Sequence, residues 1–158
     1  MSAPAKGRNI MEIRNMRAED YDDVYSLWTR TAGMGLNPLD DTREGIGKFL
    51  ARNPGTCFVA TIEGRIVGAI LSGHDGRRGF IYHAAVAAGE RLKGIGKALV
   101  AKATEALGKE GIRKVALLVM KENDIGNRFW EAEGFGVRED LVYRNKVIAA
   151  DTTAGAAR

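Results

Sequence analysis

The stretch that decides the fold runs from Phe80 to Met120 and reads FIYHAAVAAGERLKGIGKALVAKATEALGKEGIRKVALLVM. The opening run FIYHAAV and the closing run KVALLVM are short apolar segments typical of buried strands. Between them, apolar residues recur at helical spacing from about Gly96 to Lys109. Strand, helix and strand in this order predict a right-handed crossover between two parallel strands.

Upstream of this unit, the sequence predicts antiparallel strands and two helices. Residues 10–16 alternate apolar and polar side chains as a first strand, and the runs TCFVATIE and RIVGAILSG flank Gly64 as a hairpin. Apolar positions at helical spacing predict one helix between the first strand and Gly33. Thr42 is placed to cap a second helix, which we expect to end before Asn53.

Downstream of the crossover, we expect one more helix and one more strand. The helix spans about Asp124 to Glu133, and Gly134 follows it as a helix-terminating residue. A last antiparallel strand is expected around Leu141 to Ile148. Together the elements predict an α+β (mixed α/β) fold with a central mixed sheet and helices on both faces.

The composition fits one soluble domain. The chain has 158 residues, of which 45% are hydrophobic and 28% charged. We place the domain at residues 10–148 and expect flexible tails at 1–9 and 149–158. A single cysteine, Cys57, and two histidines offer no metal cluster. Because no apolar run is long enough to span a bilayer, we expect a cytoplasmic protein without a membrane segment.

A glycine-rich loop separates the strand from the helix of the central unit. Residues 90–98 read ERLKGIGKA. Two glycines at a helix N-terminus let backbone N–H groups face an anion, and Arg91, Lys93 and Lys97 add positive charge. The loop fits neither a Walker A motif nor a dinucleotide fingerprint. It predicts anion binding. The alternative interpretation is a structural loop, in which the glycines allow a tight turn and the lysines are solvated.

Two blocks of sequence together resemble a known superfamily. Arg91-x-x-Gly94-x-Gly96, directly after a strand, resembles the pyrophosphate-binding signature of the GCN5-related N-acetyltransferase superfamily. The segment NDIGNRFWEAEGF, from Asn123 to Phe135, is similar to the later motif of that family. The turn HDGRRGF is also similar to its YpeA-type bacterial branch. The resemblance implies a fold in which the parallel fourth and fifth strands splay apart around acetyl-CoA.

The resemblance implies acetyl-CoA as cosubstrate and an amine as acceptor. The backbones of Val86 and Ala87 would meet the pantetheine arm, and Asn123 would bond its amides from the far side. A backbone N–H near Val86 would stabilise the oxyanion. Trp130 stands where family members commonly place a tyrosine that protonates the leaving thiolate, and we count it with the cofactor-binding residues. The diphosphate would lie in the loop made by Arg91, Leu92, Lys93, Gly94, Ile95, Gly96, Lys97 and Ala98.

The acid and the base of the implied reaction are less defined. An indole cannot act as a general acid near neutral pH, so Trp130 either packs in the core or borders the thiol. Tyr143 is a substitute acid or a buried structural tyrosine. The candidates for the general base are His83, since imidazole titrates near neutrality, and Tyr82, directly or through water. Alternation along their strand predicts that His83 and Tyr82 lie on opposite faces.

We therefore expect an N-acetyltransferase that uses acetyl-CoA to acetylate a primary amine directly, on a small molecule or on a protein or peptide N-terminus. The alternative is a catalytically weak or inactive CoA-binding module. Nucleic-acid binding is not expected, because the local positive charge coincides with the anion loop and lacks interleaved aromatic residues. A homodimer is compatible with the sequence. Asp40 and Asp41 are expected to be solvated loop charges, and Cys57 a buried apolar residue.

Overall fold

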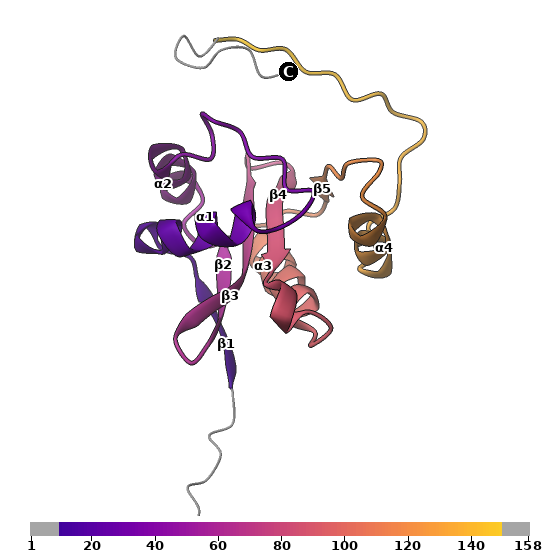
Figure 1. Ribbon diagram of the computed structural model, residues 1–158. Coiled ribbons are helices and arrows are strands. Elements are labelled where there is room, and N and C mark those ends of the chain that lie inside the picture. Colours follow the sequence, from indigo (N-terminus) through magenta and orange to yellow (C-terminus); the bar gives the residue numbers. More distant parts are fainter. Residues whose placement is uncertain (1–9, 150–158) are drawn as a thin grey trace, which may run out of the picture.

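Five strands of the chain form one mixed sheet in the spatial order β1-β2-β3-β4-β5 (Figure 1). The computed structural model describes residues 10–149. Neighbouring strands are antiparallel except β4 and β5, which run parallel, so the predicted hairpin and crossover are confirmed. The predicted tails fall almost wholly outside the described residues. The strands are β1 (Met11–Asn15), β2 (Phe58–Ile62), β3 (Arg65–His74), β4 (Gly79–Val86) and β5 (Val115–Leu117).

Four α-helices surround this sheet in the described residues. They are α1 (Tyr21–Thr29), α2 (Arg43–Arg52), α3 (Ile95–Lys109) and α4 (Asp124–Ala132), with short 3-10 turns η1 (Ala18–Asp20) and η2 (Ala88–Glu90). Thr42 caps α2 as predicted, since its hydroxyl accepts the N–H of Gly45 at 3.0 Å. Within residues 10–149, no helix combines the length and apolar character needed to cross a bilayer.

Two hydrophobic clusters lie on opposite faces of the sheet. On one face α1 and α2 pack Val24, Leu27, Trp28 and Ile46 against β3 and β4. On the other face α3 packs Leu99, Val100 and Ala103 against β2, β3 and β4, and Phe129 and Trp130 of α4 join this cluster. Helices therefore cover both faces, as the sequence predicts (Figure 1).

The predicted last strand, Leu141 to Ile148, is wrong. These residues form no strand, and the chain after α4 leaves the sheet and crosses above it (Figure 1). The reason lies in β5, which spans only Val115–Leu117 of the predicted KVALLVM run and offers a short edge for pairing. β-Propensity marks a segment suited to a pleated surface and does not create a partner strand. Leu141, Val142, Tyr143, Val147 and Ile148 are exposed.

A β-bulge in β4 changes which side chains share a face. Leu71 of β3 pairs with His83, but the next residue, Ser72, pairs with Ile81, so Tyr82 has no direct partner on β3. Tyr82 contacts Phe49 of α2, and His83 contacts Trp28 of α1. Both side chains therefore face the α1 and α2 side. The predicted alternation, with Tyr82 and His83 on opposite faces, is wrong because the bulge interrupts it.

Candidate functional site

The strands β4 and β5 separate partway along their length. Their pairing ends at Ile81, although β4 continues to Val86. Hydrogen-bonded pairs alternate in an antiparallel ladder, and the N–H of Ala87 donates to Val67 O at 2.8 Å. The N–H groups of Ala84 and Val86 therefore point away from β3, into the gap beside β5. The split leaves these amide groups of β4 free to bind a ligand.

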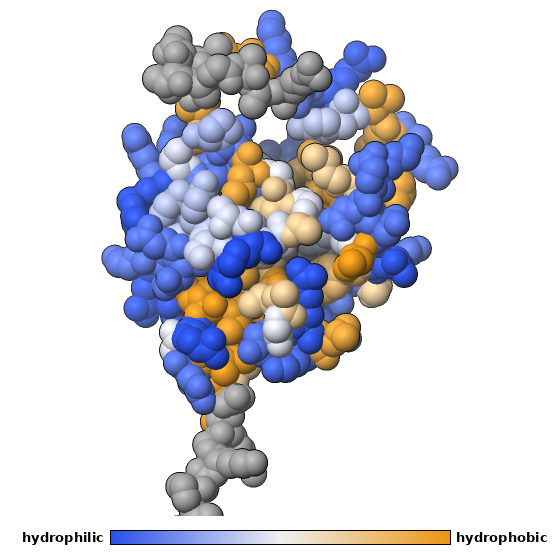
Figure 2. All heavy atoms as spheres, viewed as in Figure 1, coloured by the Kyte–Doolittle hydropathy of each residue, from blue (hydrophilic) through white to orange (hydrophobic). Residues whose placement is uncertain are grey.

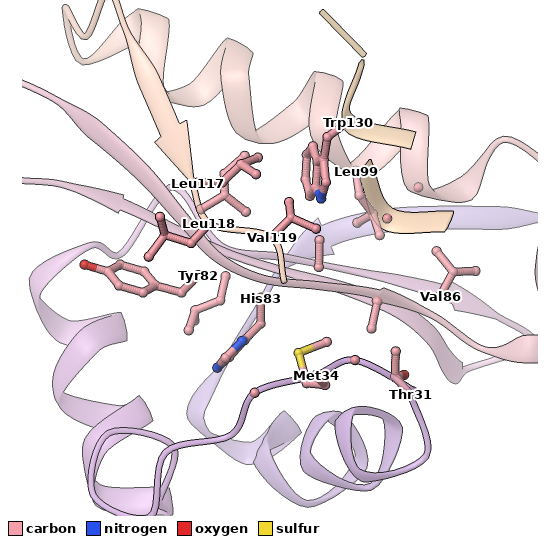
Figure 3. Close-up of a pocket in the computed structure, with 18 of the residues that line it drawn as sticks. Thr31, Met34, Tyr82, His83, Val86, Leu99, Leu117, Leu118, Val119 and Trp130 are labelled. Atoms are coloured by element: carbon pink, nitrogen blue, oxygen red, sulfur yellow. The ribbon is translucent and has the colours of Figure 1, made fainter. Parts of the chain in front are cut away.

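A cavity of about 1330 Å³ opens at this split. Apolar and intermediate residues gather along the middle of the face in Figure 2, with hydrophilic residues on either side. Figure 3 shows Leu117, Leu118 and Val119 across the gap from His83, with Trp130 beside Leu117 and above Val119. The predicted site residues that line the cavity are Tyr82, His83, Val86, Arg91, Leu92, Gly94, Ile95, Gly96, Lys97, Asn123 and Trp130.

The glycine loop has the backbone geometry of an anion site. Gly94 is the N-cap of α3 with φ +77°, and Leu92 has φ +65° with a fully exposed side chain. Left-handed residues interspersed with others are typical of backbone nests, in which successive N–H groups face one ligand. A Cβ at position 94 would meet no atom within 4 Å. Glycine therefore suits this position because of the left-handed backbone and not because of close packing.

The cations of the loop do not contribute equally. Lys93 forms a 2.6 Å ion pair with Glu90, and Arg91 Nε donates to Val86 O at 3.4 Å. Lys97 lines the cavity in the first turn of α3, where the helix dipole also favours an anion. Of the loop cations, Arg91 and Lys97 therefore line the cavity, whereas Lys93 is directed to Glu90 instead.

Ala87 and Asn123, both expected to contact the pantetheine arm, have different hydrogen bonding in the structure. The N–H of Ala87 donates to Val67 and its carbonyl accepts from Glu90 N at 2.8 Å, so both backbone groups are already engaged. Asn123 lines the cavity and caps α4, since its Oδ1 accepts the N–H of Gly126 at 3.0 Å. The Nδ2 of Asn123, close to Gly33, makes no hydrogen bond within residues 10–149 and can donate into the cavity.

Trp130, at the position of the usual tyrosine, and Tyr143, the candidate substitute acid, lie at different places on the cavity wall. Trp130 packs between Phe129 and Phe135, with ring centroids 5.0 and 5.1 Å away, and also lines the cavity. Tyr143 is exposed and lines the same cavity, so the expectation of a buried structural tyrosine is wrong. The indole thus packs against the core and also forms part of the cavity wall.

The most enclosed polar pair of the cavity was not predicted. His83 Nε2 lies 2.8 Å from Asp41 Oδ1, and both side chains are at most 10% exposed. Asp41 is therefore a buried carboxylate, not the solvated loop charge that its position before Thr42 suggests. The sequence carries no signal for this pair, since 42 residues separate the two positions.

Tyr82 also lines the cavity, and its phenol has a raised pKa. Burial raises the pKa of Tyr82, and the negative charge of Asp40, Tyr143 and Asp75 nearby adds to the increase. The phenol therefore keeps its proton at neutral pH and serves as a hydrogen-bond donor. A similar argument applies to Cys57, because burial raises the pKa of its thiol to about 12. Cys57 is a buried apolar residue, as predicted, and a poor nucleophile.

The sheet thus splits at its parallel pair, and a glycine-rich loop with nest geometry begins the helix beside the split. The acetyltransferase (GNAT) family matches residues 19–135, well over half of the chain. The chain belongs to this family, and the resemblance predicted from its two sequence blocks is confirmed.

A curated relative supports the same assignment, and two solved structures share the fold. An acetyltransferase of Sodalis glossinidius is 31% identical over 141 residues, which cover 89% of this chain and 98% of the relative. The structure of Ard1 from Thermoplasma volcanium is similar, with a TM-score of 0.72, 24% identity and coverage of 81% of this chain and 84% of that one. The PaiA N-acetyltransferase of Thermoplasma acidophilum, in complex with coenzyme A, has a TM-score of 0.71, 21% identity and coverage of 82% and 91%.

Proposed function

We propose that the protein is an acetyl-CoA-dependent N-acetyltransferase that acetylates a primary amine of a small molecule or of a protein or peptide N-terminus. The observation that carries the proposal is the continuity of one cavity, which joins the anion loop at Gly94 to the buried His83–Asp41 pair. Membership of the acetyltransferase family and the coenzyme A bound to the similar PaiA structure support it.

The cosubstrate would lie along the split between β4 and β5. Its diphosphate would accept hydrogen bonds from backbone N–H groups at the start of α3, with Arg91 and Lys97 supplying charge. Asn123 Nδ2 and the free backbone N–H of Val86 would bind the pantetheine arm. The thioester would then sit near Ala84 and Val86, whose N–H groups point into the split.

The chemistry requires four events at this point. The amine nitrogen attacks the thioester carbonyl carbon, and the negative charge that forms on the carbonyl oxygen is stabilised by a backbone N–H of β4. The proton of the attacking nitrogen passes to the base. The carbon–sulfur bond then breaks, and the CoA thiolate leaves and takes a proton from water or from an acid such as Tyr143.

Of the two candidate bases, His83 fits the role better than Tyr82. Its Nε2 faces a carboxylate, which can only accept, so Nε2 carries the proton and Nδ1 carries the lone pair. Tyr82 keeps its proton, because its pKa is raised. We assign His83 as the general base and Tyr82 as a donor that orients the acceptor or a water molecule.

A CoA-binding module without transferase activity is the second candidate. Trp130 favours it, because the position usually held by an acidic phenol offers only an indole. A thiol with a pKa of about 8.5 nevertheless leaves readily as a thiolate, so the substitution does not prevent transfer.

The experiment that tests the proposal is a panel of primary amines assayed for release of the CoA thiol from acetyl-CoA. The panel includes diamines, aminoglycosides, amino acids and short peptides with free N-termini. Turnover on any amine, together with the N-acetyl product in mass spectra, supports the transferase. Acetyl-CoA binding with no turnover on the whole panel supports the module instead. A parallel assay with the Gly94→Trp variant, whose indole would fill the loop, should show neither binding nor turnover.

A further inference from the structure

The loop before α2 is tied to the middle of β4 through Asp41 and His83. Asp41 Oδ1 bonds His83 Nε2 at 2.8 Å, and Trp28 of α1 packs edge-on against the imidazole with ring centroids 4.8 Å apart. Two elements other than β4 therefore hold the ring. Figure 3 shows the side chain of His83 directed from the strand toward the α1 and α2 side of the cavity.

The second nitrogen of this imidazole is open to the cavity. Nδ1 of His83 makes no hydrogen bond within residues 10–149. In that part of the chain, Trp28 Nε1 is the side-chain polar atom that is both enclosed and unpartnered, so Nδ1 is not sealed from solvent. Since His83 lines the cavity, its free lone pair is accessible to a ligand there.

Asp41 makes two further hydrogen bonds, one through its carboxylate and one through its backbone carbonyl. Its Oδ2 accepts the N–H of Asn37 at 2.6 Å, and its backbone carbonyl accepts the hydroxyl of Tyr21 at 2.8 Å. The N–H of Asn37 thus holds the carboxylate from the side away from His83, and Tyr21 anchors the backbone of the loop. A group held this firmly can orient a partner without reorganising when charge develops on it.

We propose that Asp41 is a positioning residue, which holds His83 with Nδ1 facing the acceptor amine and stabilises the imidazolium that forms when the amine loses its proton. The proposal rests on the proposed function, in which His83 is the base. Around the ring, Trp28 from α1 and Leu71 from β3 do not titrate, and the raised pKa of Tyr82 keeps that neighbour neutral. Asp41 therefore supplies the charge that the imidazole faces.

The test is the Asp41→Asn variant, measured across pH with the best amine of the panel. An amide can present N–H to Nε2 and so select the other tautomer, and it carries no charge. We expect kcat/KM to fall by about 10²- to 10⁴-fold with an unchanged KM for acetyl-CoA. The acid limb of the pH profile should move to lower pH, because the imidazolium is no longer stabilised. An unmoved acid limb with a small loss of rate would overturn the proposal.

Two comparisons separate positioning from a merely structural role. Tyr21→Phe removes the hydroxyl bond to the Asp41 backbone but leaves the carboxylate in place, so it should lower stability and leave the acid limb where it is. In a His83→Ala background, Asp41→Asn should cost almost nothing further, since both act through one imidazole. Additive losses in that background contradict the proposal.

A readout that does not depend on activity is the nitrogen NMR spectrum of the histidine-labelled protein, which contains only two histidines. We expect the protonated nitrogen of His83 to be Nε2 in the native protein at a pH where the ring is neutral. A protonated Nδ1 would overturn the proposal. Absence of turnover in the native protein overturns the function and the base role together, whereas this spectrum still decides the Asp41–His83 pairing.

Discussion

Gly96 of α3 lies directly against the ring of Phe129 of α4. A Cβ on Gly96 would stand 3.2 Å from two ring atoms of Phe129 and 3.6 Å from Val86 Cγ2. The second glycine of the loop therefore permits the close approach of two helices, while the first, Gly94, permits a left-handed backbone. The sequence assigned both glycines to the diphosphate, and the structure gives Gly96 a packing reason as well.

The Gly96→Val variant should lose about 1–3 kcal/mol of stability, because the added side chain meets the Phe129 ring. Gly108→Val on the same helix is the matched control, since a Cβ there meets nothing within 4 Å. We expect the control to be close to neutral in urea unfolding. The Phe129→Ala change should offset part of the loss in a double mutant. Equal effects at Gly96 and Gly108 would exclude the helix contact as the cause.

The Gly94→Ala variant tests the loop without adding bulk. Alanine strains the left-handed backbone by about 1–2 kcal/mol and should also weaken acetyl-CoA binding, because the N–H groups of the loop are displaced. Gly111→Ala is the control, since Gly111 has φ +81° and open space at the far end of α3. It should lose similar stability and keep its affinity for acetyl-CoA in titration calorimetry. A loss of affinity at both positions would point to general destabilisation.

The His83→Ala variant should lower kcat/KM by about 10²- to 10⁴-fold and leave acetyl-CoA affinity unchanged, because the base acts on the amine and not on the cosubstrate. His74→Ala is the control: His74 is the last residue of β3, and its Nδ1 accepts the N–H of Gly76 at 3.0 Å. A native rate in the His83 variant assigns the base to another group.

Much of this fold follows from local patterns. The crossover was predictable because its strands and helix are apolar segments with distinct periods. Thr42 has the hydroxyl that caps α2, and Gly64 adopts the positive φ that its hairpin turn requires. The loop at Gly94 was predictable for the same reason. These features depend on neighbours in sequence, so spacing alone indicates them.

The parts that could not be predicted depend on contacts between distant segments. The bulge at Tyr82 shifts the register between β3 and β4, and no residue type marks it. The pairing of Asp41 with His83 requires the packing of α1 and of the loop before α2. The segment from Leu141 to Ile148 has strand-like residues, but the short β5 gives it little edge to pair with. Local sequence propensity predicts neither the bulge, nor the Asp41–His83 pairing, nor the lack of a last strand.

A single-turnover experiment with acetyl-CoA labelled in its acetyl group tests the central claim most directly. The protein, in excess over the labelled cosubstrate, is mixed with the best amine and quenched in acid at intervals. Direct transfer predicts that the label passes from CoA to the amine without residing on the protein, in keeping with the buried thiol of Cys57. Label that appears first on the protein and then moves to the amine, or that never leaves CoA, would contradict the account.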